Sequence, residues 1–140
     1  MIEIVNLHKK FGENFVLKGI DLLIEEGETN VIIGKSGSGK SVLLKHIVGL
    51  LFPDDGYVKV GGEIIDKTDQ KKLYNIRKKF GYLFQGAALF DSMTVGENIA
   101  LPIVENELNV SKKELDLKIE KMLDLVELPG TENLKPAELS

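Results

Sequence analysis

The chain has 140 residues, of which 43% are hydrophobic and 29% charged, as is typical of one globular domain or a large part of one. It contains no cysteine, which excludes a disulfide framework, a thiolate zinc site and an iron–sulfur cluster. The formal net charge of −4 argues against a general affinity for nucleic acid. No apolar run approaches the ~20 residues that span a bilayer, and the first residues lack the pattern of a signal peptide.

The beginning of the sequence alternates apolar and polar residues and predicts β-strands. Residues Ile2–Phe11 and Phe15–Ile24 are expected to form two half-buried strands joined by a turn at Gly12–Asn14. Thr29–Ile33 is a short β-rich run that ends at a glycine, which is typical of a buried central strand.

A glycine-rich stretch separates this region from a mixture of helices and short strands. The first expected helix carries an apolar stripe made of Leu43, Leu44, Ile47, Val48 and Leu51. Short strands are predicted at Tyr57–Val60 and Glu63–Ile65, followed by a polar helix at Lys67–Lys79 with a solvated basic face. Phe80–Phe84 is apolar again and predicts another buried strand.

The last third of the sequence predicts helices. Thr94 and Ser111 are each followed three residues later by a glutamate, which is the spacing of a capping box. The second helix is expected to have an apolar face formed by Leu115, Ile119, Met122, Leu123 and Val126. We therefore expect an α/β protein with a β region and a strand–loop–helix unit in residues 1–86, and a helical region in residues 87–140.

The loop before the first helix carries the clearest chemical signal. Gly34–Ser41 matches the phosphate-binding pattern G-x-x-x-x-G-K-[ST], and a chance match in a chain of this composition is expected about once in a hundred sequences. The glycines have no Cβ, so backbone N–H groups can close around a phosphate, and the helix N-terminus adds positive charge. Lys40 would place its charge between the β- and γ-phosphates, and Ser41 would offer a hydroxyl to Mg²⁺.

The loop alone does not distinguish GTPases, small-molecule kinases, RecA-like motors and transport ATPases. Phe11, at the end of the first strand, is placed either to stack on adenine or to fill the core. Gln85 follows an expected strand, where catalytic groups commonly lie in open α/β sheets, although a surface amide is the simpler interpretation. The sequence ends in Pro136–Ser140.

Taken in order, these residues resemble the ATP-binding subunits of ABC transporters. The resemblance implies that Phe11 stacks on adenine, that Gly34–Ser41 is the Walker A loop, and that Gln85 is the Q-loop glutamine that touches Mg²⁺ and the attacking water. Leu139-Ser140 looks like the first two residues of the Leu-Ser-Gly-Gly-Gln signature motif. The implied fold is a truncated P-loop NTPase with a RecA-like core, an antiparallel β-subdomain and the start of an α-helical subdomain.

The resemblance also assigns roles and partners. The expected cofactors are ATP and Mg²⁺, with Lys40 and Gln85 in catalysis and Ser41 and Gln85 on the metal. The expected partners are a second ATPase subunit and a membrane permease that docks on residues 86–98, which implies a location at the cytoplasmic face of the cell membrane. The full set of expected nucleotide-binding residues is Phe11, Gly34, Lys35, Ser36, Gly37, Ser38, Gly39, Lys40 and Ser41.

Residues 84–102 are similar to the Mla/Mce-type branch of the family, whose members power phospholipid traffic, so the transported substrate is expected to be a lipid. Amino-acid and lipoprotein ABC systems share the Thr-Val-x-Glu-Asn pattern of residues 94–98 and remain alternatives.

The sequence offers no candidate for the Walker B Asp, the catalytic Glu or the switch His of the family. Asp66 and Asp124 do not follow four apolar strand residues, and His8 and His46 are expected to be surface or packing histidines. We therefore expect the N-terminal part of a longer ATPase that binds ATP and, by itself, does not hydrolyse it. Alternatives are a nucleotide-binding module without turnover, an ABC-type ATPase acting on DNA or ribosomes, and a P-loop kinase or GTPase; the guanine motif Asn-Lys-x-Asp is absent.

Overall fold

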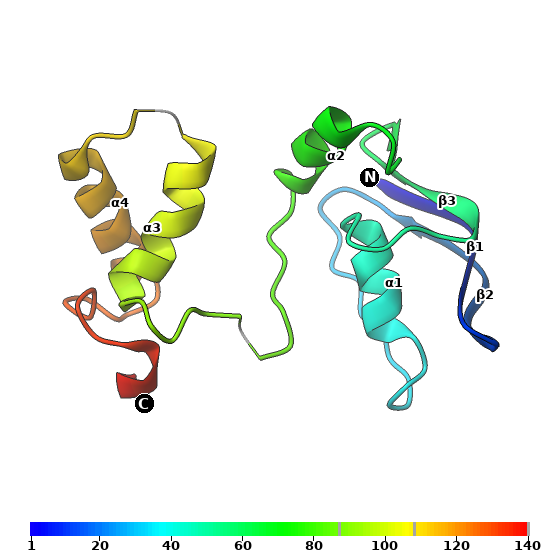
Figure 1. Ribbon diagram of the computed structural model, residues 1–140, viewed down its shortest axis with the longest axis horizontal. Coiled ribbons are helices and arrows are strands. Elements are labelled where there is room, and N and C mark those ends of the chain that lie inside the picture. The colour runs from blue at the N-terminus through cyan, green and yellow to red at the C-terminus, as the bar shows by residue number, and fades with distance from the viewer. Residues whose placement is uncertain (87, 108, 140) are drawn as a thin grey trace. The chain divides into compact units, whose positions relative to one another are not determined.

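The computed structural model describes residues 1–86, 88–107 and 109–139, and the chain forms two compact units, Met1–Tyr82 and Leu83–Ser140 (Figure 1). The expected division between residues 86 and 87 lies close to this boundary and stays a prediction. The first unit contains β1 (Ile2–Phe11), β2 (Asn14–Ile24), α1 (Lys40–Ile47), β3 (Asp55–Val60), β4 (Glu63–Ile64) and α2 (Gln70–Arg77). The second contains α3 (Val95–Asn106), α4 (Lys112–Leu125) and the 3-10 helix η1 (Pro136–Glu138).

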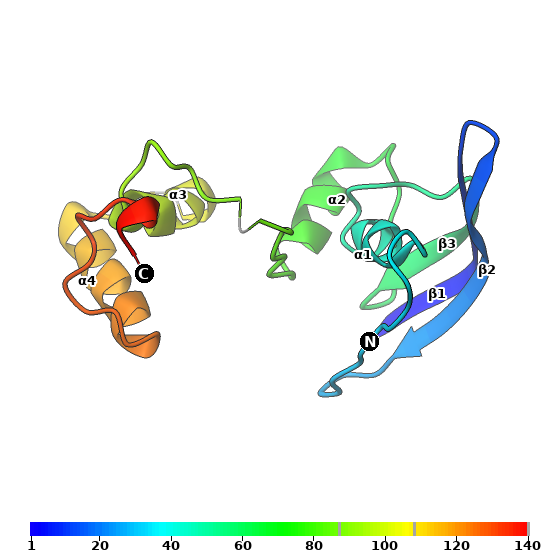
Figure 2. The same ribbon diagram turned by 90° about the horizontal axis from the view of Figure 1, so that it is seen from below.

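The four strands form one antiparallel sheet in the order β2-β1-β3-β4. The pairing of β1 with β2 runs from Ile2 opposite Ile24 to Phe11 opposite Asn14, which confirms the predicted hairpin. In both ribbon views, α1 and α2 lie on the same side of this sheet (Figures 1 and 2). The arrangement leaves one sheet face to form a core with the two helices.

The core of the first unit joins the sheet to α1 and α2. Its buried members are Ile4, Leu7, Leu17, Leu43, Ile47, Val58, Val60, Ile65, Leu73 and Ile76. Complete burial of one such side chain typically contributes about 1.5–3 kcal/mol. Leu43 and Ile47 are buried on α1 as predicted, and Val48 is buried just after its end. Leu44 is exposed, and Leu51 also lies beyond the end of α1. His46 is fully buried and its Nδ1 lies 2.7 Å from the Val42 carbonyl oxygen, as expected of a packing histidine.

Two predicted strands are not formed, and both expectations were wrong. Thr29–Ile33 and Phe80–Phe84 have no strand conformation, and Val31, Ile33 and Leu83 are 78%, 87% and 83% exposed. A strand in the middle of a sheet needs neighbours on both sides to pair with its N–H and C=O groups. Within the described residues no strand pairs with either segment. An apolar composition typical of a buried strand is therefore not enough to form one here.

The two predicted capping boxes are present and begin α3 and α4. The Thr94 Oγ1 accepts a hydrogen bond from the Glu97 N–H at 3.1 Å, and the Glu97 carboxylate accepts one from the Thr94 N–H at 2.6 Å. Ser111 and Glu114 repeat the arrangement at 3.3 and 3.0 Å. The cap at Ser111 also lowers the pKa of Glu114, because two hydrogen bonds favour the ionised carboxylate.

The segment after α4 crosses the first turn of α3. The Val95 and Gly96 N–H groups donate to the carbonyl oxygens of Leu134 and Glu132 at 2.8 and 2.9 Å. A Cβ on Gly96 would lie 2.9 Å from the Glu132 carbonyl oxygen, so this approach requires glycine.

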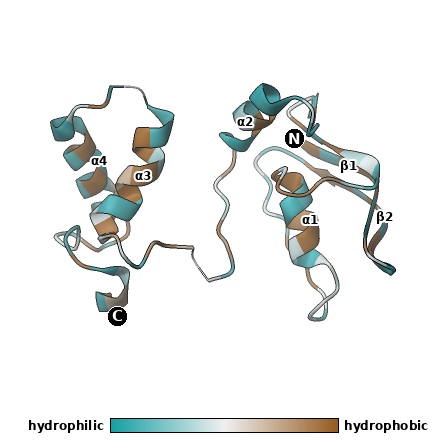
Figure 3. Cartoon of the chain, in the orientation of Figure 1, coloured by the Kyte–Doolittle hydropathy of each residue, from teal (hydrophilic) through white to brown (hydrophobic). Residues whose placement is uncertain are grey.

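Helices α1, α3 and α4 are amphipathic, with hydrophobic and hydrophilic residues on different sides (Figure 3). On α4, Leu123 is buried but Met122 and Val126 are 48% and 58% exposed, so only part of the predicted apolar face is covered. No helix among the described residues is long and apolar enough to cross a membrane.

Candidate functional site

The loop Gly34–Gly39 leads directly into α1, and its three glycines differ in what a side chain would meet. Gly37 and Gly39 have φ of +78° and +92°, a conformation that residues with a side chain rarely adopt. A Cβ on Gly34 would lie 2.7 Å from the Ser38 Oγ. The loop conformation therefore depends on glycine at residues 37 and 39, whereas at Gly34 a rotation of the Ser38 side chain would relieve the contact.

The end of the loop, at Gly39, packs closely against β2. A Cβ on Gly39 would lie 3.1 Å from both Val16 Cγ1 and Leu17 Cδ2, and 3.2 Å from the Val16 carbonyl oxygen. The pairing of β1 and β2 skips Val16, which is the extra residue of a β-bulge. Bulges often re-aim a side chain beside a functional site. Sequence analysis missed this contact, because the break in register carries no local sequence signal.

The N-terminus of α1 differs from those of α2, α3 and α4, whose first residues are capped by the side chains of Asp69, Thr94 and Ser111. The α1 cap is Gly39, which has no side chain to donate or accept, and the first turn contains no acidic residue. Its first N–H groups and the positive end of the helix dipole are therefore available to an anion.

Lys40 reaches back across the loop. Its Nζ donates hydrogen bonds to the carbonyl oxygens of Gly34 and Lys35, both at 2.8 Å. A lysine ammonium has three donors, so one remains for a phosphate oxygen after these two bonds. Lys35 and Ser36 are exposed on the loop, and Ser41 is exposed on the first turn of α1. The structure thus gathers the positive charge, the N–H groups and the hydroxyl at one helix end.

The β1–β2 hairpin brings Phe11 towards the loop. Phe11 pairs with Asn14, and Val16, which contacts Gly39, follows two residues later, or about 7 Å along a strand. The Phe11 ring is 48% exposed, and the Lys9 Nζ lies 5.7 Å from its centroid. Of the two alternatives for Phe11, this exposure excludes the core aromatic and leaves a ring face for a flat ligand. The stacking of adenine on that ring stays a prediction.

A second exposed aromatic, Phe15, lies on the opposite face of the same hairpin. Phe15 pairs with Lys10, and neighbouring residues of a strand point to opposite faces, so Phe11 and Phe15 point apart. Phe15 is 55% exposed and the Lys10 Nζ lies 5.9 Å from its ring. The two rings have similar exposure and chemistry and differ in the face that they occupy.

Asp54 fixes the end of β1 next to Phe11. Its carboxylate accepts hydrogen bonds from the Lys9 Nζ at 2.8 Å and the Lys10 N–H at 2.7 Å, and Lys9 also donates to the Phe52 carbonyl oxygen at 2.9 Å. The bond from Lys9, followed by that from Lys10, lowers the pKa of Asp54 because both favour the ionised carboxylate. Sequence analysis missed this group, since its partners lie more than forty residues away.

We expect the stabilisation by Asp54 to depend on pH. A carboxyl with a lowered pKa in the folded state stabilises the fold above its unfolded pKa, about 3.9, and loses that contribution as the pH falls through the folded value. Asp54→Asn should therefore lower the midpoint of urea unfolding at pH 7, and the deficit should shrink below about pH 3. Asp55→Asn is the matched control, because within the described residues Asp55 accepts from its sequence neighbour, the N–H of Gly56 at 2.9 Å, and not from a distant strand. An equal deficit for Asp54→Asn at both pH values would contradict this prediction.

The remaining predicted residues lie in the second unit. Gln85 lies in an exposed turn of the second unit, whereas the loop Gly34–Gly39 belongs to the first. The proximity of Gln85 to this loop therefore stays a prediction. Leu139 is partly buried after η1, whereas Ser140 and Ala87 lie outside the described residues.

No cluster of three or more metal-ligating His, Asp or Glu side chains occurs in the described parts of the chain. Mg²⁺ bound to a nucleotide takes most of its ligands from phosphates and water and needs only one or two protein oxygens. The exposed Ser41 hydroxyl at the uncapped helix end fits that limited requirement.

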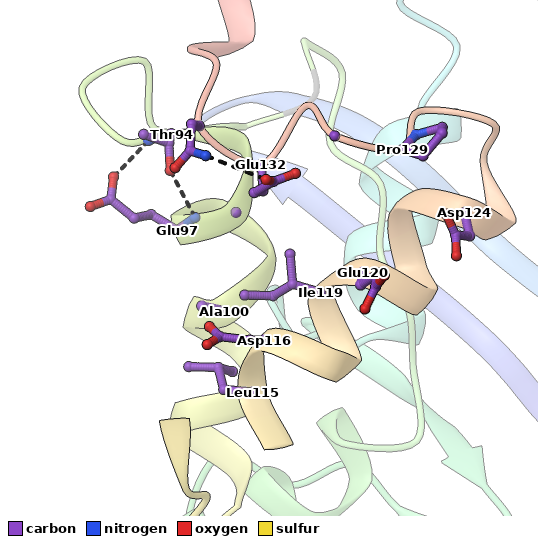
Figure 4. Close-up of a pocket in the computed structure, with 13 residues that line it drawn as sticks. Thr94, Glu97, Ala100, Leu115, Asp116, Ile119, Glu120, Asp124, Pro129 and Glu132 are labelled. Carbon is purple, nitrogen blue, oxygen red and sulfur yellow. Dashed lines mark hydrogen bonds between the residues drawn. The ribbon is translucent and has the colours of Figure 1, made fainter. Parts of the chain in front are cut away.

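The second unit contains a pocket of about 570 Å³ between α3, α4 and residues 129–133 (Figure 4). Five carboxylates line it and no Lys, Arg or His does, and Asp116, Glu120 and Asp124 follow one stripe of α4. Their charge would repel a triphosphate. This pocket is therefore not a candidate for the nucleotide, despite its size.

Comparison with known proteins decides the family. The family model described as ABC transporter matches residues 17–140. The chain belongs to this family. It is 42% identical, over 139 residues, to the probable ribonucleotide transport ATP-binding protein mkl of Mycobacterium leprae, covering 99% of this chain and 40% of that protein. It is also 42% identical to the methionine import ATP-binding protein MetN of Francisella tularensis, covering 100% of this chain and 41% of that protein.

A solved structure confirms the expected ABC fold. The dimeric post-hydrolysis state of the ATP-binding cassette MJ0796, bound to ADP and Pi, superimposes on 100% of this chain and 63% of its own with a TM-score of 0.87 and 35% identity. The chain therefore spans about two fifths of these curated ABC relatives and under two thirds of this cassette.

Proposed function

We propose that the chain is the nucleotide-binding part of an ABC transporter ATPase, with Gly34–Ser41 around the phosphates of ATP. The observation that carries the proposal is the N-terminus of α1, which has no side-chain cap and follows a glycine loop with Lys40 folded across it. Backbone N–H groups, the helix dipole and one ammonium donor together suit a polyphosphate and no neutral ligand.

The adenine base is proposed to lie on Phe11. Its half-exposed ring belongs to the strand whose partner contacts Gly39, so a nucleotide held by the loop could extend its base to that ring. Asp54 and Lys9 hold the end of this strand in place.

The base contact predicts unequal effects of two similar substitutions. Removing an aromatic ring that stacks on a base typically costs about 1–3 kcal/mol, so Phe11→Ala should weaken ATP binding about 5- to 150-fold. Phe15→Ala should leave the affinity nearly unchanged, because Phe15 points to the opposite hairpin face. Isothermal titration calorimetry of the purified protein with ATP measures both. Equal affinities for the two variants would remove Phe11 from the site.

Mg²⁺ is proposed to be held by the Ser41 hydroxyl, the Gln85 side-chain oxygen and phosphate oxygens. The metal would neutralise charge on the phosphates. Lys40 would orient the terminal phosphate, and Gln85 would hold the attacking water. Hydrolysis itself is proposed for the whole protein, in a dimer of ATPase subunits such as the one described for MJ0796. Residues 1–140 by themselves are proposed to bind ATP without turnover.

The membrane partner is proposed to be a permease that contacts residues 86–98, so that the ATPase lies at the cytoplasmic face of the cell membrane. The proposed cargo is a lipid, on the similarity of residues 84–102 to the Mla/Mce-type branch. The relatives described above are named for probable ribonucleotide transport and for methionine import. Amino acids and lipoproteins remain alternative cargoes, because those ABC systems share the Thr-Val-x-Glu-Asn pattern of residues 94–98. Uptake of labelled phospholipid and methionine by cells lacking the ATPase distinguishes these cargoes.

A further inference from the structure

One side chain fastens the loop that precedes α3. The Asn98 Oδ1 accepts a hydrogen bond from the Phe90 N–H at 2.8 Å, and the Asn98 Nδ2 donates to the Phe90 carbonyl oxygen at 3.1 Å. The same Nδ2 donates to the Thr94 carbonyl oxygen at 2.9 Å and lies 3.5 Å from that of Met93. Asn98 therefore holds both backbone polar groups of Phe90 and the residue that caps α3.

The carboxamide is the chemical group that this arrangement requires. It has an acceptor and two donors, like a peptide unit, so it can pair with Phe90 as a neighbouring strand would. Aspartate would keep the acceptor and lose both donors, and alanine would lose all three. The loop is held from a second side by the Lys135 Nζ, which donates to the Ser92 carbonyl oxygen at 2.7 Å.

The fastened backbone presents two apolar side chains to solvent. Leu89 and Phe90 are 51% and 52% exposed. Exposed aromatic anchors contribute most to an interface when they are held in the bound conformation beforehand, because binding then costs less ordering entropy.

The charge of the second unit indicates what kind of partner covers this loop. Residues 83–140 contain five Lys and eleven Asp or Glu, a net charge of −6. Cytoplasmic loops of membrane proteins carry an excess of Lys and Arg. A cytoplasmic segment of a permease, basic with an apolar side, is therefore complementary to an acidic unit that displays Leu89 and Phe90.

We propose that Asn98 is a positioning residue for permease docking, which holds the Phe90 backbone so that Leu89 and Phe90 form a preformed anchor for that segment. The inference rests on the proposed function, since it takes the loop to be the permease-binding surface.

The test measures binding of the full-length ATPase to native membrane vesicles stripped of their own ATPase, with protein-free lipid vesicles alongside. Asn98→Ala and Asn98→Asp should each weaken vesicle binding about tenfold, as expected when hydrogen bonds that order a contact are lost. Asn106→Ala is the matched control on the same helix, because the Asn106 Nδ2 donates to the Pro102 carbonyl oxygen of that helix at 2.7 Å. It should bind within about twofold of the wild type.

Hydrogen exchange distinguishes a role of Asn98 in positioning the loop from a role in folding. The Phe90 amide should exchange faster in Asn98→Ala and stay protected in Asn98→Asp, which still accepts from it. Faster exchange throughout α3 in both variants would make Asn98 a folding residue and overturn the inference. Binding of Asn98→Ala at wild-type strength, with Phe90→Ala defective, would overturn it while leaving the docking surface intact.

Two further results would contradict the proposed permease contact itself. Wild-type binding by both Leu89→Ala and Phe90→Ala would remove the docking surface, and with it the inference. Equal binding to protein-free lipid vesicles would replace the permease by lipid and overturn both. ATP affinity, measured on each variant, should stay unchanged and reports independently on the nucleotide site.

Discussion

Lys40→Ala is expected to weaken ATP binding by about 10- to 100-fold, the effect of removing a charged hydrogen bond of about 1.5–3 kcal/mol. The Lys40 Nζ is held 2.8 Å from two carbonyl oxygens of the loop, with one donor left for a phosphate. The side chain is therefore already positioned before the nucleotide binds, and little ordering entropy opposes the contact.

Lys35→Ala is the matched control for this prediction. It removes the same formal charge from the same loop, but the Lys35 side chain is exposed and only its backbone oxygen takes part in the lysine contact. We expect its ATP affinity to fall less than about threefold, through the long-range field alone. Calorimetry at two salt concentrations measures both variants. Equal losses would mean that the loop attracts phosphate by net charge and that Lys40 has no specific place in it.

The elements that sequence analysis predicted correctly depend on interactions between near neighbours. The hairpin of β1 and β2 follows from alternation and a short turn. The helix starts at Thr94 and Ser111 follow from a hydroxyl and a glutamate three residues apart, and both capping boxes are present. In each case the residues that stabilise the element lie close together in the sequence, so the local pattern that predicts the element contains them.

The errors occur where the partner is distant. Thr29–Ile33 has the composition of a central strand, yet Ile33 is 87% exposed because no described strand pairs with it. The amino-acid composition of a segment indicates whether it favours a strand, but it does not show which strands lie beside it in the fold. For the same reason the sequence could not show that Asp54 fixes Lys9 beside Phe11.

The candidate site is visible in the sequence as a motif, and its binding of nucleotide stays a prediction, whereas the residues that support the loop were not predicted. The phosphate-binding pattern names residues 34–41 but gives no hint that β2 contacts them. Val16 has no charge or polar group that would attract attention, and its importance comes from a bulge in the strand register. Functional groups can be found from spacing, whereas the surfaces that hold them require the fold.

Gly39→Ala is expected to be the most damaging single-methyl substitution in the loop. It meets two penalties at once: a φ of +92°, and a Cβ 3.2 Å from the Val16 carbonyl oxygen and 3.1 Å from two β2 side chains. A left-handed alanine costs about 1–2 kcal/mol and overpacking about 1–3 kcal/mol, so the free energy of unfolding should fall by about 2–5 kcal/mol. The backbone oxygen yields less readily than a side chain, so relief of this contact requires a small shift between the loop and β2.

Gly37→Ala separates these two penalties. Gly37 also has a positive φ, +78°, but a Cβ there would meet no atom within 4 Å. We expect only the backbone cost of about 1–2 kcal/mol. Because the Gly39 clash lies between the loop and the hairpin that carries Phe11, Gly39→Ala should also weaken ATP binding more than tenfold, while Gly37→Ala retains more of the affinity. Urea unfolding and calorimetry on the two variants provide the comparison. Equal losses of stability would show that the backbone conformation alone, and not the contact with β2, makes glycine necessary at residue 39.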